Sequence, residues 1–490
     1  MQNKILTHNL AVIASLLPKK LWEHFVTLCM TPRPSEGEAA MANIVVALAH
    51  QHNLQVVTRD KYHNVLVRIP ATLGYEHIPS LCLQSHLDMV CVKDENVTEM
   101  FPVKLNLSDG KLSATGTTLG ADNGIGVAAM MTIMSDSTIP HGPLDLLFTT
   151  VEETGMTGAE HFDYSLLESK RILNLDSEEE GIIYVGCAGG GSVVGSLNVE
   201  SHTPNRNYKT YSIEISGLQG GHSGVDIHLN RGNAIKILVN TLADMADIDY
   251  SIVSFDGGTA MNAIPASAKA IVVIYYNDLP KFKNLIPLLS GRVAKLSHAG
   301  KLEVNFKEIA NDTNTKVWSG EAQQRFLWVI KKLPDGVLSF EPKNEMMVQS
   351  SNNVGMVKTS GNGTNVEITS MFRSSHREDL EKLGNEINLV FITAEIPATK
   401  KSDHLPWEPQ FDTKLLGMLM RKYRQMFNVK PEVKTIHAGL EAAMFYKHMN
   451  NVEIVSFGPT MCEVHTTKEW VDTGSVTRFY DYLLALLTEK

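Results

Sequence analysis

Cysteine is scarce in this sequence of 490 residues, and the few cysteines form no binding pattern. Their number is odd, they are scattered, and no two have the CxxC spacing of a redox or zinc motif: Cys29, Cys82, Cys91, Cys187 and Cys462. This usage favours buried or idle thiols in a reducing compartment and argues against a disulfide framework.

Long hydrophobic runs are also absent. The apolar segment NLAVIASLL, at residues 9–17, is short, follows a single lysine and continues directly into PKK. A secretory signal would need a more charged start and a small-residue cleavage site after a longer core, and a spanning helix would need about 20 apolar residues. The segment is instead predicted to be an amphipathic helical stretch interrupted near Pro18. The sequence therefore predicts a soluble, cytoplasmic protein without a membrane partner.

Blocks of positive charge are missing as well. The net charge of −10 comes from 44 basic and 54 acidic residues spread along the chain, so a nucleic-acid partner is not expected. The remaining composition, with 43% hydrophobic and 20% charged residues, is that of an ordinary globular protein. A chain of this length is expected to form two or more domains.

The first 186 residues alternate between helical and strand-like segments. Helices are predicted at 36–50 and 123–134, and apolar strands at 64–69, 80–88, 144–151 and 171–176. The same texture returns after residue 401, with a helix at 414–427 and a strand in NVEIVSFGP. Apolar strands between helices indicate an α/β domain with its chemistry at the strand ends. Residues 1–186 and 401–490 are therefore predicted to form one split catalytic domain, a mixed sheet flanked by helices.

Residues 187–400 differ in texture and are predicted to form an inserted α+β lid domain. After the glycine-rich CAGGGS come a strand (208–216), a helix (231–245), two strands (251–256, 268–276) and a helix (282–297). A similar order recurs as a strand (302–306), a helix (321–333), two strands (337–340, 364–372) and a helix (378–391). This recurrence predicts a doubled lid, whose second unit spans roughly residues 302–397.

Acids and histidines stand where several apolar strands end. They are His86 and Asp88 in SHLDMV, Asp122 in TLGADNGIG, Glu152 and Glu153 in FTTVEETG, Asp176 in LNLDSE and His465 in MCEVHTT. Each alone has an ordinary explanation. A histidine after a strand is usually a hydrogen-bonded structural residue, Asp122 could cap the following helix, and Asp176 could end its strand in a turn.

The set as a whole indicates a metal centre. Five segments would bring these groups to one edge of the domain, where buried carboxylates must be paired or coordinate a cation. Imidazole and carboxylate without thiolate suit zinc, cobalt or manganese, and a bridging carboxylate such as Asp122 can hold two ions. Because neighbouring side chains diverge in a loop, Glu153 is expected to bind metal and Glu152 to be the general base. Asp88 is expected to accept the second N–H of the His86 imidazole.

These motifs resemble those of the co-catalytic zinc peptidases of the aminoacylase, carboxypeptidase and dipeptidase group. The resemblance rests on SHLDMV, GTTLGADNGIG, EETGMTGA, NLDSEEEG, CAGGG and SGLQGGHSG, which occur in the family's order along essentially the whole chain. HAGLE at residues 437–441, the doubled lid and the length resemble, within this group, the bacterial aminoacyl-histidine dipeptidases. The resemblance implies that His86 and Asp176 bind one metal, that Glu153 and His465 bind the other, and that Asp122 bridges both.

The resemblance also implies an activity and a substrate site. Such enzymes hydrolyse unblocked dipeptides, especially Xaa-His substrates such as β-alanyl-histidine (carnosine), with a water at the metals activated by the residue that matches Glu152. The implied substrate contacts in the lid are His222 in GGHSG, Asn262 in GGTAMNAIP, Arg373 in MFRSS and Gly439 in HAGLE. Physically, His222 suits an oxyanion donor and Arg373 suits a terminal carboxylate. On the residues alone, GLQGGHSG could be a flexible hairpin and Arg373 a surface ion-pair partner.

Several alternatives stay open at this level. A related carboxypeptidase, tripeptidase or N-acyl amino acid hydrolase would use the same metal chemistry, and a non-catalytic binding protein could keep the scaffold. Ala442 and Ala443 replace the Cys-Gly that often follows HAGLE in these dipeptidases, which leaves that pocket wall open. Relatives with a single lid unit share a lid histidine across a homodimer. The second lid unit here contains no GHSG, so His222 is expected to act within its own chain.

Overall fold

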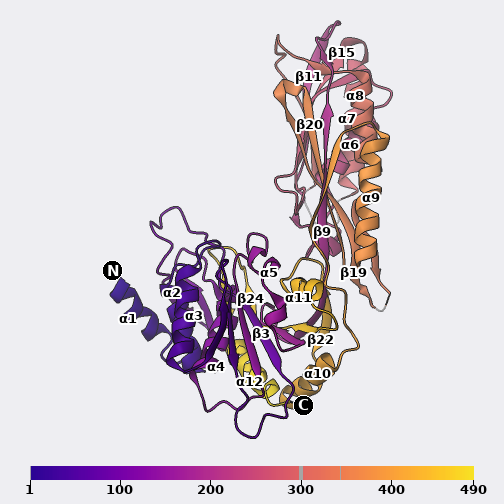
Figure 1. Cartoon of the computed structure of the whole chain (residues 1–490). Helices are drawn as coiled ribbons and strands as arrows, with labels where there is room; N and C mark the ends of the chain where they lie inside the picture. The colour runs from indigo at the N-terminus through magenta and orange to yellow at the C-terminus, as the bar shows by residue number, and fades with distance from the viewer. Residues whose placement is uncertain (1, 297–301, 343, 490) are drawn as a thin grey trace. The chain divides into compact units, whose positions relative to one another are not determined.

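The computed structural model describes residues 2–296, 302–342 and 344–489, which form two compact units (Figure 1). The α/β unit comprises Met1–Gly186, Pro409–Thr435 and Leu440–Lys490, and the inserted unit comprises Cys187–Glu408 and Ile436–Gly439. Residues 401–408 and 436–439, expected in the catalytic domain, thus belong to the inserted unit. The reason is strand pairing, because β21 (Ala398–His404) runs antiparallel along β9 (Gly189–Asn198), a pairing that no local pattern reveals.

The α/β unit is built on an eight-stranded mixed sheet. Its strands, in spatial order, are β1 (Gln55–Arg59), β2 (Val65–Ile69), β6 (Leu144–Thr149), β3 (Leu81–His86), β7 (Arg171–Asn174), β23 (Glu453–Ser456), β8 (Ile182–Cys187) and β22 (Glu432–Ile436). β3 is parallel to both β6 and β7, and β7 is parallel to β23. The carboxyl ends of these four strands therefore lie at one edge of the sheet, as the sequence predicted for the three strands that precede candidate ligands.

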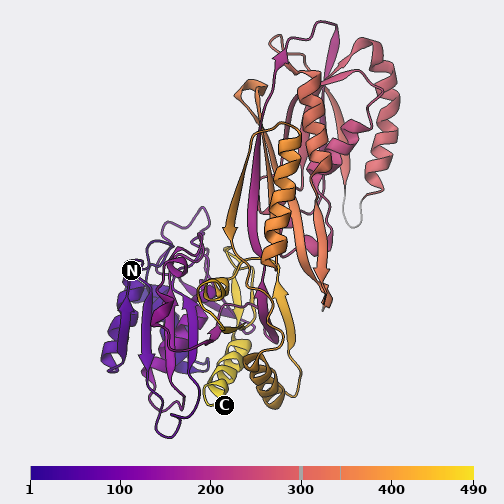
Figure 2. The ribbon, with the colours of Figure 1, turned by 45° about the vertical axis from the view of Figure 1, so that its right-hand side comes forward.

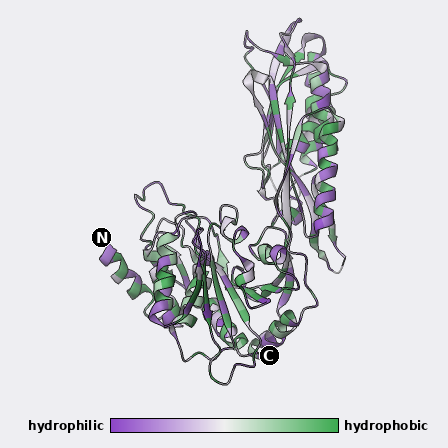
Figure 3. Ribbon diagram, viewed as in Figure 1, coloured by the Kyte–Doolittle hydropathy of each residue, from purple (hydrophilic) through white to green (hydrophobic). Residues whose placement is uncertain are grey.

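Helices cover this sheet and bury its apolar strands. They are α1 (Gln2–Val12), α2 (Lys19–Met30), α3 (Ala39–Gln51), α4 (Ala121–Ser135), α5 (Thr157–Glu160), α10 (Lys414–Phe427), α11 (Ala442–His448) and α12 (Thr473–Leu486). All six residues of β3 and of β6 are buried, and Figure 3 shows the hydrophobic character of the strands in this sheet. The predicted N-terminal helical stretch is two helices, α1 and α2, separated around Pro18.

A second, four-stranded sheet of the α/β unit ties the C-terminal region to an early segment. Its order is β24 (Met461–Cys462), β25 (Trp470–Asp472), β5 (Lys111–Ala114) and β4 (Leu105–Ser108). The connection between β24 and β25 contains His465, so this small sheet fixes both ends of the loop that carries a candidate ligand. This sheet was not predicted from the sequence.

The inserted unit contains a nine-stranded sheet with four helices along one face (Figures 1 and 2). The further strands are β11 (Tyr208–Ser216), β13 (Tyr250–Gly257), β15 (Ala268–Tyr275), β16 (Glu303–Ile309), β18 (Gly336–Glu341), β19 (Asn344–Ser360) and β20 (Asn365–Ser374). The helices are α6 (Ala234–Ala243), α7 (Leu279–Ala294), α8 (Gly320–Lys332) and α9 (Arg377–Thr393). Two-stranded pairs complete the unit: β10 (Ser201–His202) with β17 (Val317–Trp318), and β12 (Gly221–His222) with β14 (Ala263–Ile264). Residue 297, the predicted end of one helix, lies outside the described residues.

The nine-stranded sheet consists of two halves of the same topology. The first half runs β11, α6, β13, β15, α7, β16, and its spatial order is β16-β11-β15-β13. The second half runs β9, α8, β19, β20, α9, β21, with the spatial order β19-β20-β9-β21. If the four strands of a half are numbered in chain order, both halves have the spatial order 4-1-3-2. The two halves meet where β13 pairs with β19.

The lid is thus doubled, but the predicted boundary between its units was wrong. The strand expected to open the second unit is β16, and it pairs along β11, so it completes the first half. The second half instead begins with β9, upstream of the whole first half. Local periodicity identifies a strand but not its partner, and the 17-residue strand β19 was not predicted at all.

Side chains from one half hold loops of the other at the seam between them. Asn353 on β19 donates hydrogen bonds from Nδ2 to Met261 O at 3.2 Å and to Ala263 O at 2.8 Å. A side chain on Gly258 would collide with the carbonyl of Gly355, so the backbones of the two halves approach closely there. The loop that carries Asn262 is therefore positioned from the opposite half. Within the described residues, no helix has both the length and the apolar character that crossing a membrane demands.

Candidate active site

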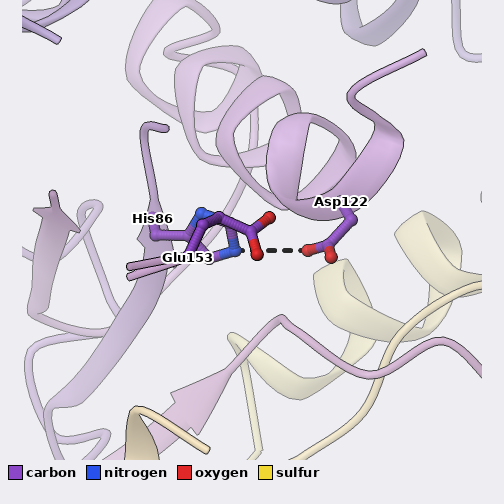
Figure 4. A group of neighbouring side chains, drawn as sticks. All are labelled: His86, Asp122 and Glu153. Carbon is purple, nitrogen blue, oxygen red and sulfur yellow. Dashed lines mark hydrogen bonds and ion pairs between the residues drawn. The ribbon is translucent and has the colours of Figure 1, made fainter. Parts of the chain in front are cut away.

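Five polar side chains from five segments of the α/β unit converge at the carboxyl ends of its parallel strands: His86, Asp122, Glu153, Asp176 and His465. His86 Nε2 lies 3.2 Å from Asp122 Oδ1 and 3.2 Å from Asp176 Oδ1. His465 Nε2 lies 3.1 Å from Asp122 Oδ2 and 3.1 Å from Glu153 Oε2. Asp122 therefore presents one oxygen to each imidazole, and it belongs to both of two groups of three candidate ligands. Figure 4 shows His86, Asp122 and Glu153 pointing toward one another.

Asp122 owes its position to an irregular start of α4. Its backbone (φ −78°, ψ 115°) is not helical, and its carboxylate oxygens are paired with His86 and His465, so the alternative that it merely caps the helix is wrong. Glu469 instead binds the first amide of the helix and the two amides just before it. Its Oε2 accepts from Leu119 N at 2.7 Å and Gly120 N at 3.0 Å, and its Oε1 accepts from Ala121 N at 2.8 Å. The carboxylate of Asp122 is thereby left free to face both histidines.

Asp88 organises the loop that carries the two adjacent glutamates. Its Oδ1 accepts a hydrogen bond from Glu152 N at 3.1 Å, and its Oδ2 accepts one from Glu153 N at 3.1 Å. Asp88 Oδ1 also lies 3.4 Å from His86 Nδ1. Val151, just before the glutamates, has a φ of 57°, a costly conformation for a β-branched residue that reverses the chain after β6. One carboxylate thus orients both His86 and the paired glutamates.

The charges of this cluster fit divalent cations. Hydrogen bonds to Asp122 and Glu153 raise the pKa of His465 to about 11, against the effect of burial. Burial alone would lower the pKa of His86, but Asp176, Asp122 and Asp88 outweigh it and raise that pKa well above its usual range. The cluster therefore attracts positive charge strongly. In addition, the buried Oε1 of Glu153 has no hydrogen-bond partner among the described residues, and a cation is the natural partner for such an atom.

Burial raises the pKa of Glu152 well above its usual range, and the neighbouring carboxylates of Asp176 and Glu153 add to this effect while His86 opposes it. A carboxylate with a raised pKa is a better proton acceptor, which is the property a general base needs. The geometry therefore gives the adjacent acids different surroundings. Glu153 lies against His465, whereas the half-buried Glu152 is surrounded by groups that favour its protonated form.

A buried hydrogen-bond network supports the strands beneath this cluster. Thr149 at the end of β6 donates to Glu441 Oε2 at 2.6 Å, and Gln84 on β3 donates to the same oxygen. Asn174 on β7 donates to Gln84 Oε1 at 2.6 Å. Burial raises the pKa of Glu441 to about 8. The network therefore links three neighbouring strands two to four residues before they reach the candidate metal ligands.

The predicted lid residues form a separate cluster within the inserted unit. Burial first, and then the charge of Arg373, lower the pKa of His222 to about 4, so its imidazole is neutral. Its Nδ1 accepts hydrogen bonds from Gly224 N at 3.2 Å and Val225 N at 3.1 Å, which leaves the proton on Nε2. Ser223 N, next to His222, donates to Asn262 O at 2.8 Å. Three of the four predicted substrate residues therefore lie in one neighbourhood.

Arg373 is 4% exposed and stands among imidazoles that the sequence analysis did not select. Burial and then Arg373 lower the pKa of His404 to about 4 and that of His437 to about 3. Gly439, the fourth predicted residue, lies against His404: a Cβ at Gly439 would be 2.8 Å from His404 Nε2. The surface ion-pair alternative for Arg373 is therefore wrong, because its guanidinium is buried.

Comparison with known proteins agrees with this arrangement. Residues 82–489 match the sequence profile of peptidase family M20/M25/M40. The chain is 33% identical over 485 residues to the cytosol non-specific dipeptidase of Escherichia coli strain K12, covering 97% of this chain and 99% of that protein. This chain belongs to the M20 peptidase family.

Solved structures of two peptidases show the same fold. The crystal structure of aminoacylhistidine dipeptidase from Vibrio alginolyticus is similar with a TM-score of 0.87, at 33% identity and over 98% of each chain. An aminopeptidase PepT from Bacillus cereus shares the fold with a TM-score of 0.56 at 16% identity. The predicted fold class, a zinc-peptidase-type α/β domain interrupted by an inserted lid, is confirmed.

The supporting roles of Glu469 and Glu441 were not predicted from the sequence, although Glu441 is the last residue of HAGLE. These two glutamates bind the helix start and the strand ends, but each acts on segments hundreds of residues away in the chain. His437 was visible as the first residue of HAGLE, while nothing around His404 distinguishes it from an ordinary surface histidine. The one sequence feature that could have pointed to Glu469 is that it is an acidic residue with no basic partner nearby in the sequence.

Replacing Asp122 by alanine is expected to remove both metal ions, because its two oxygens face both groups of ligands. Asp176→Ala is the matched control. Asp176 lies near His86, and within the described residues no hydrogen bond or ion pair joins it to His465, so this variant should lose one ion and keep the other. Metal analysis of the purified, folded variants checks this, and two ions bound to Asp122→Ala with wild-type affinity would rule out a bridging role.

Proposed function

We propose that this protein is a metal-dependent dipeptidase that hydrolyses unblocked dipeptides, including Xaa-His substrates such as carnosine. The observation that carries the proposal is the double group of candidate ligands that shares Asp122, next to a half-buried glutamate suited to be a general base. The names of the two similar full-length proteins, a cytosol non-specific dipeptidase and an aminoacylhistidine dipeptidase, support the substrate class.

Two divalent cations would be held by His86 and Asp176 on one side, by Glu153 and His465 on the other, and by Asp122 between them. When bound, such a pair lowers the pKa of water and polarises the carbonyl to be attacked. Zinc fits the donor set best, and cobalt or manganese is also compatible with it.

The protein's own residues then direct the proton transfers. Glu152 accepts a proton from the water as its oxygen bonds to the scissile carbonyl carbon, and donates that proton to the amine nitrogen as the C–N bond breaks. Asp88 keeps Glu152 in place through its main-chain amide and orients His86. The Nε2–H of neutral His222 suits the oxyanion that develops on the carbonyl oxygen.

The inserted unit supplies the groups that would recognise substrate ends. The buried guanidinium of Arg373 is suited to a terminal carboxylate, since a planar fork can bind both oxygens. The main chain at Asn262 and Gly439 shapes the neighbourhood of this group. Recognition of a free carboxylate next to the scissile bond favours dipeptides over blocked or longer peptides.

A tripeptidase, one of the alternatives that the sequence leaves open, is the second candidate function. A further relative, Peptidase T of Vibrio cholerae, is 28% identical over 330 residues, covering 58% of this chain and 73% of that protein, and its name states no substrate. This likeness is weaker and shorter than that to the dipeptidases. Hydrolysis of a panel of carnosine, other dipeptides, tripeptides and acyl amino acids by metal-reconstituted enzyme separates these functions. Faster turnover of tripeptides or acyl amino acids than of any dipeptide would contradict our proposal.

We also propose a cellular location and binding partners for this protein. The Escherichia coli relative is described as cytosolic, which supports a cytoplasmic location for this protein. Its partners would be small dipeptides. The sequence contains no block of basic residues that would indicate a nucleic-acid partner. A homodimer is compatible with the fold but is not required by the doubled lid.

Glu152→Gln is expected to lower kcat at least about a hundredfold while both metal ions stay bound, because a general base acts on water and is not a ligand. Kinetics and metal analysis on the same preparation check both halves of this statement. Glu160→Gln, a change at an exposed glutamate paired with Lys447, should leave both values unchanged. Loss of both ions from folded Glu152→Gln would show that Glu152 is a ligand.

Amidation of carnosine at its carboxyl end is expected to reduce kcat/KM by roughly ten- to a hundredfold, since a charged hydrogen bond contributes about 1.5–3 kcal/mol. Arg373→Ala should be poor on carnosine and insensitive to amidation. Arg206→Ala, at an exposed arginine of the same unit, should keep the full amidation effect. An Arg373→Ala enzyme that still discriminates against the amide would refute the assignment.

His222 and Arg373 come from different halves of one inserted unit, so a chain is expected to need no lid residue from a second copy. Removing an oxyanion donor typically costs about a hundred- to a thousandfold in kcat, and His222→Ala should fall in this range. Mixing inactive Glu152→Gln and His222→Ala proteins under conditions that allow subunit exchange tests the source of the histidine. No activity should return, and recovered activity would mean that His222 acts across chains.

A further inference from the structure

A short loop between α2 and α3 contacts three of the segments that carry the candidate ligands and the base. This 31–38 loop has the sequence TPRPSEGE. Ser35 donates a hydrogen bond to Asp88 Oδ2 at 2.8 Å, and Glu38 Oε1 accepts one from Val151 N at 2.9 Å. Pro34 pairs with Met89 in an isolated bridge, in which Met89 N donates to Arg33 O at 3.1 Å. The loop therefore lies against the ends of β3 and β6.

Arg33 extends these contacts to the start of α4. Its Nη1 donates hydrogen bonds to Leu87 O at 3.0 Å and to Asp88 O at 2.8 Å. Its Nη2 donates to Gly120 O at 2.5 Å. One planar guanidinium thus connects the residues directly after His86 to the residue two positions before Asp122. These are the two segments whose separation decides whether His86 and Asp122 can share a cation.

The environment of Arg33 is unusual for a structural arginine. Its side chain is 1% exposed, and no carboxylate oxygen in the described residues lies within 4.0 Å of its guanidinium. Its Nε also has no hydrogen-bond partner in that part of the chain. Burying an ion without a close counter-ion is unfavourable, and an apolar residue at such a position is often at least as stable. The stability of the fold alone therefore does not explain why a charged side chain stands at position 33.

Two glycines of TLGADNGIG make room for this guanidinium. A Cβ at Gly120, which has a φ of 72°, would collide with Nη2, and a Cβ at Gly124 would lie 2.9 Å from it. Gly120 and Gly124 therefore leave the space that Arg33 occupies against the start of α4, whereas the third glycine of the motif, Gly126, lies against Asn123, Ser85 and Leu175. The helix start and the 31–38 loop fit each other closely.

We propose that Arg33 is a positioning residue of the metal centre, which holds the end of β3 and the start of α4 at the separation that allows His86 and Asp122 to bind the same cation. The proposal rests on the proposed function only in requiring that the protein binds metal. It assigns to Arg33 no contact with substrate or with the reacting atoms.

Lysine cannot replace Arg33 in this role, although it keeps the positive charge. An ammonium is a single point on a flexible stem, whereas the guanidinium offers donors on two separate nitrogens in a fixed plane. The three carbonyl oxygens lie on two different segments, so only a fork satisfies both together. Loss of residues that orient metal ligands typically weakens metal affinity or activity by about ten- to a hundredfold.

The test measures zinc affinity of metal-free protein by competition with a chelator, with thermal unfolding of the same samples recorded separately. Arg33→Lys and Arg33→Met should both bind zinc about ten- to a hundredfold more weakly than wild type. At saturating zinc, kcat for a dipeptide should fall while KM changes little. Arg68 provides the matched control: it donates to Asp145 Oδ1 at 2.8 Å at the opposite end of β6. Arg68→Lys should change thermal stability but not zinc affinity.

Gly124→Ala tests the positioning role of Arg33 without removing Arg33. It remains a valid test if the Arg33 variants do not fold. Alanine favours helix over glycine, so the fold should be retained while the new Cβ displaces the guanidinium, and zinc affinity should fall. Wild-type zinc affinity in folded Arg33→Lys or in Gly124→Ala would overturn the proposal, as would an equal loss in Arg68→Lys. Failure of the wild-type protein to bind zinc would instead contradict the proposed function.

Discussion

Mutual repulsion among buried carboxylates is the constraint on which the rest of this structure depends. Parallel strands of one sheet deliver Glu153 and Asp176 to the same edge, and α4 brings Asp122 to meet them. The interior cannot hold these charges unless cations or protons compensate them. The raised pKa values of His86 and His465 express this demand for positive charge. A pair of divalent ions would satisfy it and would supply the chemistry of a hydrolase.

The supporting structure keeps this repulsive group in one geometry. Glu469 binds the amides at the start of α4, Asp88 binds those of the paired glutamates, and Arg33 connects the two regions. None of these residues lies in a regular helix or strand. Their bonds fix loop conformations that repulsion alone would spread apart. In the inserted unit, loops of two topologically equivalent halves are bound to each other in a similar way, as by Asn353.

Much of this could be predicted from the sequence, because the strong signals are local. Apolar runs such as 144–151 define a buried strand, and an acid directly after it is conspicuous, so the ligand segments and the α/β class were accessible. The pairing partners of the strands could not be predicted. β16 pairs with β11 in the first half of the inserted unit, and β9 pairs with β21 in the second half, although the order of the strands along the chain indicates neither pairing. Arg33 was overlooked for the same reason: its acceptors lie about 55 and 87 residues away in the chain, and its own neighbourhood reads as a plain loop.

The most direct test of this account is a crystal structure of the zinc-reconstituted protein, with anomalous scattering recorded on both sides of the zinc edge. The account predicts two zinc peaks in the α/β unit, one bound by His86 and Asp176, the other by Glu153 and His465, with one oxygen of Asp122 on each. A single zinc ion, or two ions that do not share Asp122, would contradict it.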